Sequence, residues 1–168
     1  MRKLIIVASL FFSTTLYSQQ KLPVKDGNVM YEAIDTVMGA SRDQLYHKAK
    51  LWLTNEFVSS KDVIQIDDKD SGQIIGKGNF DYEYSVLGTS ATWVCSFTIK
   101  IDCKDNKARI QIYNISARCA ASMTAEYMNE HPGSSKKHIK SIDNRLTSML
   151  SDFKKSLQKN SSSSSDNF

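Results

Sequence analysis

The sequence predicts an α+β fold: a single antiparallel β-sheet with two helices packed on one face. Between residues 93 and 103, apolar and polar side chains alternate with a period of two, which is typical of a strand with one buried face. Residues 41–57 and 136–158 instead repeat apolar side chains every three or four positions, which is typical of amphipathic helices. The expected order is β-α-β-β-β-β-α, with the other sheet face in water.

The first strand and the first helix have clear boundaries. Residues 28–37, NVMYEAIDTV, mix β-branched and aromatic residues and predict a strand that Gly39 and Ala40 end. Ser41 is the expected N-cap of the helix, and Gln44 completes a capping box. The apolar stripe of this helix consists of Leu45, Ala49, Trp52, Leu53 and Phe57.

Two strands and an acidic stretch follow the helix. Residues 62–66, DVIQI, predict a short strand, and the stretch from residue 73 to 84 predicts a second with its even positions buried. Gly76 and Gly78 fall on that apolar face, where the missing side chains allow a helix or a bulge to approach closely. The apolar side chains on the buried face of this second strand are Ile74, Phe80, Tyr82 and Tyr84. Residues 87–91, LGTSA, form the next turn.

Residues 93–103 and 108–116 are expected to form a hairpin around Asp105–Asn106. The apolar phase changes after Ile112, so a bulge is expected near Tyr113. In this register Cys103 faces Ala108 and Cys95 faces Ser116. Cys119 then lies about three positions, near 10 Å, past Cys95, so a disulfide between them would need a bulge or a chain reversal. Buried free thiols are the expectation.

The C-terminal third begins with a segment of unclear period. Residues 117–135 predict a long loop or a weak helical excursion, and the second helix then carries its own stripe. Residues 159–168 are serine-rich and predict a disordered tail. The stripe consists of Ile139, Ile142, Leu146, Leu150, Phe153 and Leu157.

The N-terminal residues have the layout of a secretory signal peptide. Arg2 and Lys3 precede an apolar run over residues 4–12, and cleavage is expected after Ser18. Nine apolar residues span roughly 14 Å as a helix, about half a bilayer, so no transmembrane span is expected. The expected organisation is a signal peptide at 1–18, a single domain at 19–158 and the tail at 159–168. The protein is then exported, to the periplasm or the extracellular space.

Residues 67–80, DDKDSGQIIGKGNF, combine acidic residues with glycines and are therefore a candidate for a loop that binds calcium or phosphate. Neither register of its acidic residues places glycine and glutamate where an EF-hand requires them. Its glycines lack the spacing of a phosphate-binding loop, and a strand rather than a helix follows. A solvated turn between two strands is the expected structure.

No catalytic, cofactor-binding or metal-ligating residues can be assigned. His47 is expected to face solvent, His131 lies in the loop before Pro132, and His138 lies in the first turns of the last helix. No pair of histidines or cysteines has a metal-ligand spacing, and no nucleophile motif occurs. We therefore expect no cofactor and no enzyme activity; an active site assembled from scattered residues ranks lowest.

The last helix is basic, which indicates either a solvated face or contact with an anionic surface or glycan. Asp143 and Asp152 interrupt the basic run. The basic residues are Lys136, Lys137, Lys140, Arg145, Lys154, Lys155 and Lys159.

Several segments together resemble a known bacterial family. They are residues 22–57, residues 62–80 with their IIGKG strand, the hairpin through DNKARIQIYNI, and the closing helix. They are similar to domain of unknown function 4468, which has a TBP-like fold and is frequent in exported Bacteroidales proteins. The resemblance covers about Leu22 to Gln158, and departs in residues 117–135 and in the tail. It implies a β-α-β(4)-α fold and, because the family has no assigned activity, no functional residues.

A TBP-like fold suggests DNA, but the charge pattern opposes nucleic acid as a partner. The predicted open face carries four basic and three acidic residues, whereas duplex binding requires a clearly basic surface. Export would also separate the protein from the nucleoid. The residues counted are Lys77, Lys100, Lys104 and Arg109 against Asp81, Glu83 and Asp102.

Two functions remain from these patterns. The first is a non-catalytic binding module of the cell envelope, which contacts a protein, a peptide or an envelope component through the open sheet face or the last helix. The alternative is a carrier that holds a small apolar ligand between the sheet and the C-terminal helix, in a cavity lined by residues such as Tyr82, Trp93 and Phe97.

Overall fold

The computed structural model describes residues 22–57, 63–86, 88–121, 126–127 and 136–159. The expected signal peptide and residues 160–168 of the expected tail lie outside this part. The elements, in chain order, are β1 (Val24–Lys25), β2 (Asn28–Val29), β3 (Tyr31–Thr36), α1 (Arg42–Glu56), β4 (Ile64–Asp68), β5 (Gln73–Val86), β6 (Thr89–Lys104), β7 (Lys107–Cys119), β8 (Glu126–Tyr127) and α3 (Lys136–Gln158).

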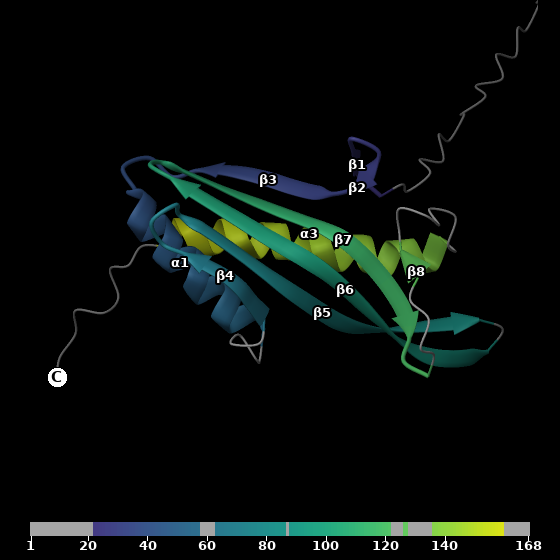
Figure 1. Ribbon diagram of the computed structural model, residues 1–168. Coiled ribbons are helices and arrows are strands. Elements are labelled where there is room, and N and C mark those ends of the chain that lie inside the picture. The colour runs from purple at the N-terminus through teal and green to yellow at the C-terminus, as the bar shows by residue number, and fades with distance from the viewer. Residues whose placement is uncertain (1–21, 58–62, 87, 122–125, 128–135, 160–168) are drawn as a thin grey trace, which may run out of the picture.

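The predicted α+β architecture is confirmed. The main sheet has the strand order β3-β7-β6-β5-β4, all pairs are antiparallel, and β8 joins β7 beyond the end of β3. Both helices lie behind this sheet in Figure 1, so that they cover one face, and neither of them lies on the other. The predicted first strand is divided at Met30, because Asn28 and Val29 pair with β1 in a separate small hairpin.

Helix α1 begins with the predicted capping box. The Gln44 amide donates to Ser41 Oγ at 3.3 Å, and the Ser41 amide donates to Gln44 Oε1 at 2.9 Å. Its stripe is buried as expected, and Phe57 is the C-cap. The stripe of α3 also includes Met149, which is 1% exposed and which the sequence pattern missed. Neither α1 nor α3 has the length and apolar character needed to cross a membrane.

The predicted bulge in β7 is confirmed. Ser96 pairs with Ser116, but Thr98 pairs with Tyr113, so β7 carries one extra residue at this point. Asn114 has a φ of 52°, and the change of phase buries both Ile112 and Ile115.

The bulge corrects the expected register beyond it. Cys95 faces Ala117 rather than Ser116, and Cys119 lies opposite Trp93. All three cysteines are free thiols, and burial raises the pKa of Cys95 to about 12.

The prediction of a loop or a weak helical excursion over residues 117–135 is wrong for the first part of this segment. Strand β7 continues to Cys119, and β8 pairs with it through Ser116–Tyr127 and Ala117–Glu126. The side chains here are mostly small, and the bulge shifts their phase, so period-two alternation was too weak to indicate a strand. Residues 122–125 and 128–135 lie outside the described part.

The covered face of the sheet has two chemically different ends. The aliphatic end consists of five isoleucines with no exposed surface, and α1 and α3 pack on it through residues such as Leu45 and Leu146. The aromatic end lies toward the β5–β6 turn, against the start of α3. The aliphatic end comprises Ile74, Ile99, Ile101, Ile110 and Ile112, and the aromatic end comprises Phe80, Tyr82, Tyr84, Trp93 and His138.

Two glycines allow close packing between these ends, as predicted. A Cβ built on Gly78 would lie 2.7 Å from Phe57 Cε1 and 2.7 Å from the Phe97 ring. A Cβ built on Gly76 would lie 3.0 Å from the Val63 carbonyl oxygen, beside the irregular start of β4. The end of α1 can therefore reach the sheet because β5 lacks side chains at these positions.

The open sheet face as candidate functional site

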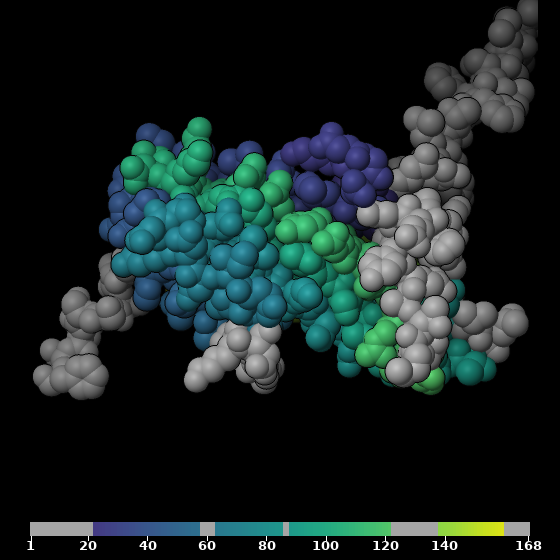
Figure 2. Space-filling view, viewed as in Figure 1, coloured from purple at the N-terminus to yellow at the C-terminus, as the bar shows by residue number. Residues whose placement is uncertain are grey.

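The face opposite the helices is formed by the second set of side chains of each strand, and Figure 2 views the molecule from this side. Strands β3, β7, β6, β5 and β4 all contribute to it, so it is as wide as the sheet. Its residues were predicted from the alternation in β5, β6 and β7. Their interactions across the strands decide what this surface can bind.

Asp102 is the centre of a polar network on this face. Its Oδ2 accepts hydrogen bonds from Arg109 Nη2 at 2.7 Å and Nε at 3.2 Å, and its Oδ1 accepts from Gln73 Nε2 at 2.9 Å. Lys100 Nζ lies 3.6 Å from the same carboxylate. Burial acts to raise the pKa of Asp102, but the bonds from Arg109 and Gln73 outweigh it and hold the pKa below its usual value. Asp102 is therefore a charged group held in a fixed orientation.

A second network joins the edge strand to the centre of the sheet. Glu32 accepts from Lys25 Nζ at 2.7 Å and from Gln111 Nε2 at 2.6 Å. The bond from Lys25 is the main reason that the pKa of Glu32 lies below its usual value. Sequence patterns did not indicate this network, because it requires the pairing of β3 with β7 across more than seventy residues.

Exposed isoleucines flank the two networks. Ile34 on β3 is 61% exposed, and Ile66 on β4, at the opposite edge, is 46% exposed and pairs with Ile75. Large apolar side chains exposed beside fixed polar groups are a common composition of protein-binding surfaces.

The charges of the open face are mixed in sign. Strand alternation and the registers place six basic and five acidic side chains of the main sheet's described strands on this side. The basic ones are Lys77, Lys100, Lys104, Lys107, Arg109 and Arg118, and the acidic ones are Glu32, Asp68, Asp81, Glu83 and Asp102. Basic and acidic side chains are therefore interspersed, and the face lacks the uniformly basic surface that a phosphate backbone requires.

The acidic stretch forms the predicted turn between β4 and β5. Asp68 Oδ1 accepts the Ser71 amide at 3.0 Å, and Gly72 has a φ of 71°. Asp67 accepts from Lys50 Nζ at 2.5 Å and from the Tyr46 hydroxyl, and the bond from Lys50 is the main reason that its pKa is lowered. Within the described residues, no three His, Cys, Asp or Glu side chains are grouped to hold a metal.

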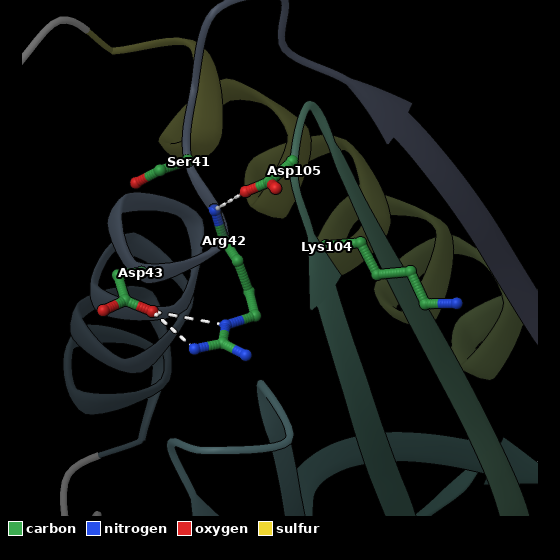
Figure 3. A pocket seen from close by; sticks show the side chains of 5 residues that line it. All are labelled: Ser41, Arg42, Asp43, Lys104 and Asp105. Carbon is green, nitrogen blue, oxygen red and sulfur yellow. Dashed lines mark hydrogen bonds and ion pairs between the residues drawn. The ribbon is translucent and has the colours of Figure 1, made fainter.

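An open pocket of about 470 Å³ lies at the start of α1, and its polar groups already bond to one another (Figure 3). The Arg42 amide donates to Asp105 Oδ1 at 2.8 Å, and its guanidinium bonds to Asp43 and to the Asp70 carbonyl. Lys104 points away from this group. The pocket thus joins α1 to two turns and brings together no nucleophile and base.

His138 is buried, with 3% of its surface exposed, although the sequence indicated no role for it. Its ring lies 4.7 Å from Trp93, 5.1 Å from Tyr84 and 5.2 Å from Tyr82, between centroids, and Nε2 lies 2.9 Å from the Tyr82 hydroxyl. The available signal was its position four residues before Ile142, on the buried side of α3.

The side chains proposed to line a ligand cavity are therefore packed against protein groups. The His138 imidazole lies between Tyr82 and Trp93, and Phe97, 3% exposed, contacts the rings of Phe57 and Phe80. His47 is exposed as predicted, and His131 lies outside the described residues.

Three basic residues of α3 are engaged in ion pairs within the fold. Arg145 Nη2 lies 2.7 Å from Glu56 of α1, and Lys154 Nζ lies 3.8 Å from the buried Asp35 of β3. Lys155 pairs with Asp152 at 2.9 Å. The first two contacts hold α3 against α1 and β3, and all three reduce the charge that the helix offers to a partner.

Comparison with known proteins identifies the fold. A family model described as "Domain of unknown function (DUF4468) with TBP-like fold" matches residues 31–118. A crystal structure of a DUF4468 family protein from Bacteroides ovatus is similar with a TM-score of 0.71 and 17% identity, over 84% of this chain and 92% of that one. A TBP-like protein from Parabacteroides distasonis is similar with a TM-score of 0.67 and 13% identity, over 82% and 97%. No curated protein matches the sequence.

Proposed function

The chain belongs to the DUF4468 family of domains of unknown function with a TBP-like fold, as its sequence resemblance indicated, and on this premise we propose that it is a non-catalytic binding module. Its open sheet face contacts a protein partner in the cell envelope. The observation that supports this proposal is the contrast between the two faces of one sheet. The covered face is filled by the core, whereas the open face carries fixed charges beside exposed isoleucines.

The fixed orientation of the open-face charges favours recognition. Arg109 and Asp102 constrain each other, so that a partner would lose little side-chain entropy when it bonds to them. Ile34 and Ile66 supply apolar area at the two edges. A protein surface with matching donors, acceptors and apolar groups suits this arrangement better than nucleic acid, since the charges are mixed.

The proposed location follows from the N-terminal segment. Arg2, Lys3 and the apolar residues after them support export and cleavage after Ser18. We propose residues 19–158 as the working domain and 159–168 as its tail, in the periplasm or outside the cell. The carrier function gains no support, because the proposed lining residues contact His138 or other aromatic rings.

Affinity capture from the native cell envelope tests this proposal. The wild-type protein and the double variant Ile34→Ser, Ile66→Ser serve as baits, and the recovered proteins are compared by quantitative mass spectrometry. Loss of the two exposed side chains removes apolar contact area without disturbing the core, so the partner should be recovered at a tenth or less of the wild-type amount, roughly the effect of two interface side chains.

The matched control is Leu51→Ser, which removes an exposed leucine (53%) from the outer surface of α1. It should recover the partner as well as the wild type does. Recovery unchanged in the double variant, or lost in Leu51→Ser, would place the binding surface elsewhere and contradict the proposal.

A further inference from the structure

Strand β5 has an outer edge that no described strand covers over residues 77–81. It pairs with β6 along its whole length, from Gln73–Asp102 to Val86–Thr89. On its other side β4 pairs with it only as far as Gly76, which faces Ile64. Alternate backbone N–H and C=O groups beyond Gly76 therefore point away from the sheet, as on any edge strand.

Two charges on this edge strand lack the ion pairs found elsewhere on the open face. Lys77 and Asp81 lie across from Thr98 and Val94 of β6, neither of which carries a charge. Asp102, Glu32 and their basic partners all form ion pairs or hydrogen bonds, whereas Lys77 and Asp81 form none among the described residues. Four residues apart on one strand, they are roughly 13 Å from each other and cannot pair within the chain.

We propose that the partner of this edge is a second copy of the chain, joined by antiparallel β5–β5 pairing about a twofold axis at Asn79. In this register each Lys77 faces Asp81 of the other copy, so that the twofold axis produces two Lys77–Asp81 ion pairs across the interface. Gly78 faces Phe80 of the other copy, and the two Asn79 residues face each other. The pattern is self-complementary, as an isologous contact requires.

The length of the contact predicts its strength. The ladder can run only over residues 77–81, because β4 covers the edge of β5 at residues 73–76 and the twofold axis at Asn79 places residue 82 opposite residue 76 of the other copy. An interface this short falls below the roughly 1,200 Å² of stable complexes, so the dimer should be weak and dependent on concentration. It would align two open sheet faces side by side and so double the binding surface for a symmetric or repeated partner.

Disulfide trapping tests the register directly. The protein carries Cys119→Ser, which removes the half-buried thiol, together with either Asn79→Cys or Asp81→Cys. In the Asn79→Cys dimer the two introduced cysteines would have their Cα atoms about 5 Å apart, within disulfide range, whereas in the Asp81→Cys dimer they would be roughly 14 Å apart. Mild oxidation should therefore give a covalent dimer with Asn79→Cys and little with Asp81→Cys.

Charge reversal provides an independent readout in the Asn79→Cys background. Lys77→Glu or Asp81→Lys places like charges opposite each other twice, and each should lower the yield of trapped dimer about tenfold. The double variant Lys77→Glu, Asp81→Lys restores opposite charges and should recover the yield. Circular dichroism of each variant checks that the fold is retained.

Four results would overturn the proposal. Equal trapping of the Asn79→Cys and Asp81→Cys variants would indicate random collision, and no trapping of Asn79→Cys would indicate no contact. Failure of the double charge reversal to restore trapping would exclude the Lys77–Asp81 pairing. A monomer in sedimentation equilibrium at every concentration would exclude the dimer, while the binding of another protein to the open face would be unaffected.

Discussion

The aliphatic and aromatic ends of the covered sheet face both lie on β5 and β6, with β7 added at the aliphatic end, but they differ in what covers them. At the aliphatic end, Ile74, Ile101 and Ile110 lie side by side across three strands and are fully buried beneath both helices. At the aromatic end, Tyr82, Tyr84 and Trp93 are half-buried and pack around one imidazole from the start of α3.

This difference indicates that the aliphatic end contributes more of the folding stability, whereas the aromatic end opens more easily. Aliphatic side chains with no exposed surface contribute the most per residue to folding. The aromatic end depends on fewer elements and on a buried polar group, His138, so it should open at lower free energy than the rest. Four substitutions sharpen or break this comparison.

The largest effect is expected at the aliphatic end from Ile101→Ala. Ile101 lies between Ile74 and Ile110 with no exposed surface, so truncation leaves a cavity that rigid neighbours cannot fill. The free energy of unfolding in urea should fall by about 2–5 kcal/mol. Ile34→Ala, on the open face, is the matched control and should change it by less than about 0.5 kcal/mol. Equal effects of the two would contradict the layered core.

At the junction between the ends, Gly78→Ala should destabilise the protein by about 1–3 kcal/mol through overpacking. The added methyl would lie 2.7 Å from both Phe57 and Phe97. Asn79→Ala, on the exposed neighbour, is the control. A neutral Gly78→Ala variant in chemical denaturation would show that the end of α1 does not contact β5 as described.

At the aromatic end, His138→Phe keeps a ring but removes the bond to the Tyr82 hydroxyl. The loss should cost about 1 kcal/mol. Amide hydrogen exchange should accelerate near Tyr82 and Trp93 while the amides of Ile101 and Ile110 keep their protection. Faster exchange at both ends would show that the two ends unfold as one unit.

The smallest effect is expected on the open face, from Asp102→Asn. Because the pKa of Asp102 is lowered in the folded protein, its stabilisation is present above its unfolded pKa of about 4 and is lost as pH falls through the folded pKa. Asp102→Asn should cost about 1 kcal/mol at neutral pH, and the difference from wild type should shrink in acid. Urea unfolding across pH measures it, and a difference that grows in acid would contradict the sign.

Much of this structure could be predicted from local sequence patterns. The alternation in β6 predicted the turn at Asp105–Asn106, and the phase change between Ile112 and Ile115 predicted the bulge. Gly76 and Gly78 indicated a close approach before its partners were known. Each of these features depends on residues that are near one another in the chain.

The features that escaped prediction depend on distant residues or on weak side-chain signals. The bond between the Tyr31 hydroxyl and Asp143, at 2.9 Å, joins elements 112 positions apart. The burial of His138 required the distant strands β5 and β6, and the end of β7 was missed because its residues are small. The open face was predicted as a surface, but its Glu32 network required the pairing of β3 with β7.

The central claim, that the open face binds the partner, is tested most directly by lysine acetylation of the native complex. Mass spectrometry would compare Lys100 and Lys107, which lie on the open face, with Lys140 and Lys155, which lie on α3. We predict that the captured partner lowers acetylation of Lys100 and Lys107 severalfold and leaves Lys140 and Lys155 unchanged. Protection of the α3 lysines with an unprotected open face would contradict the account.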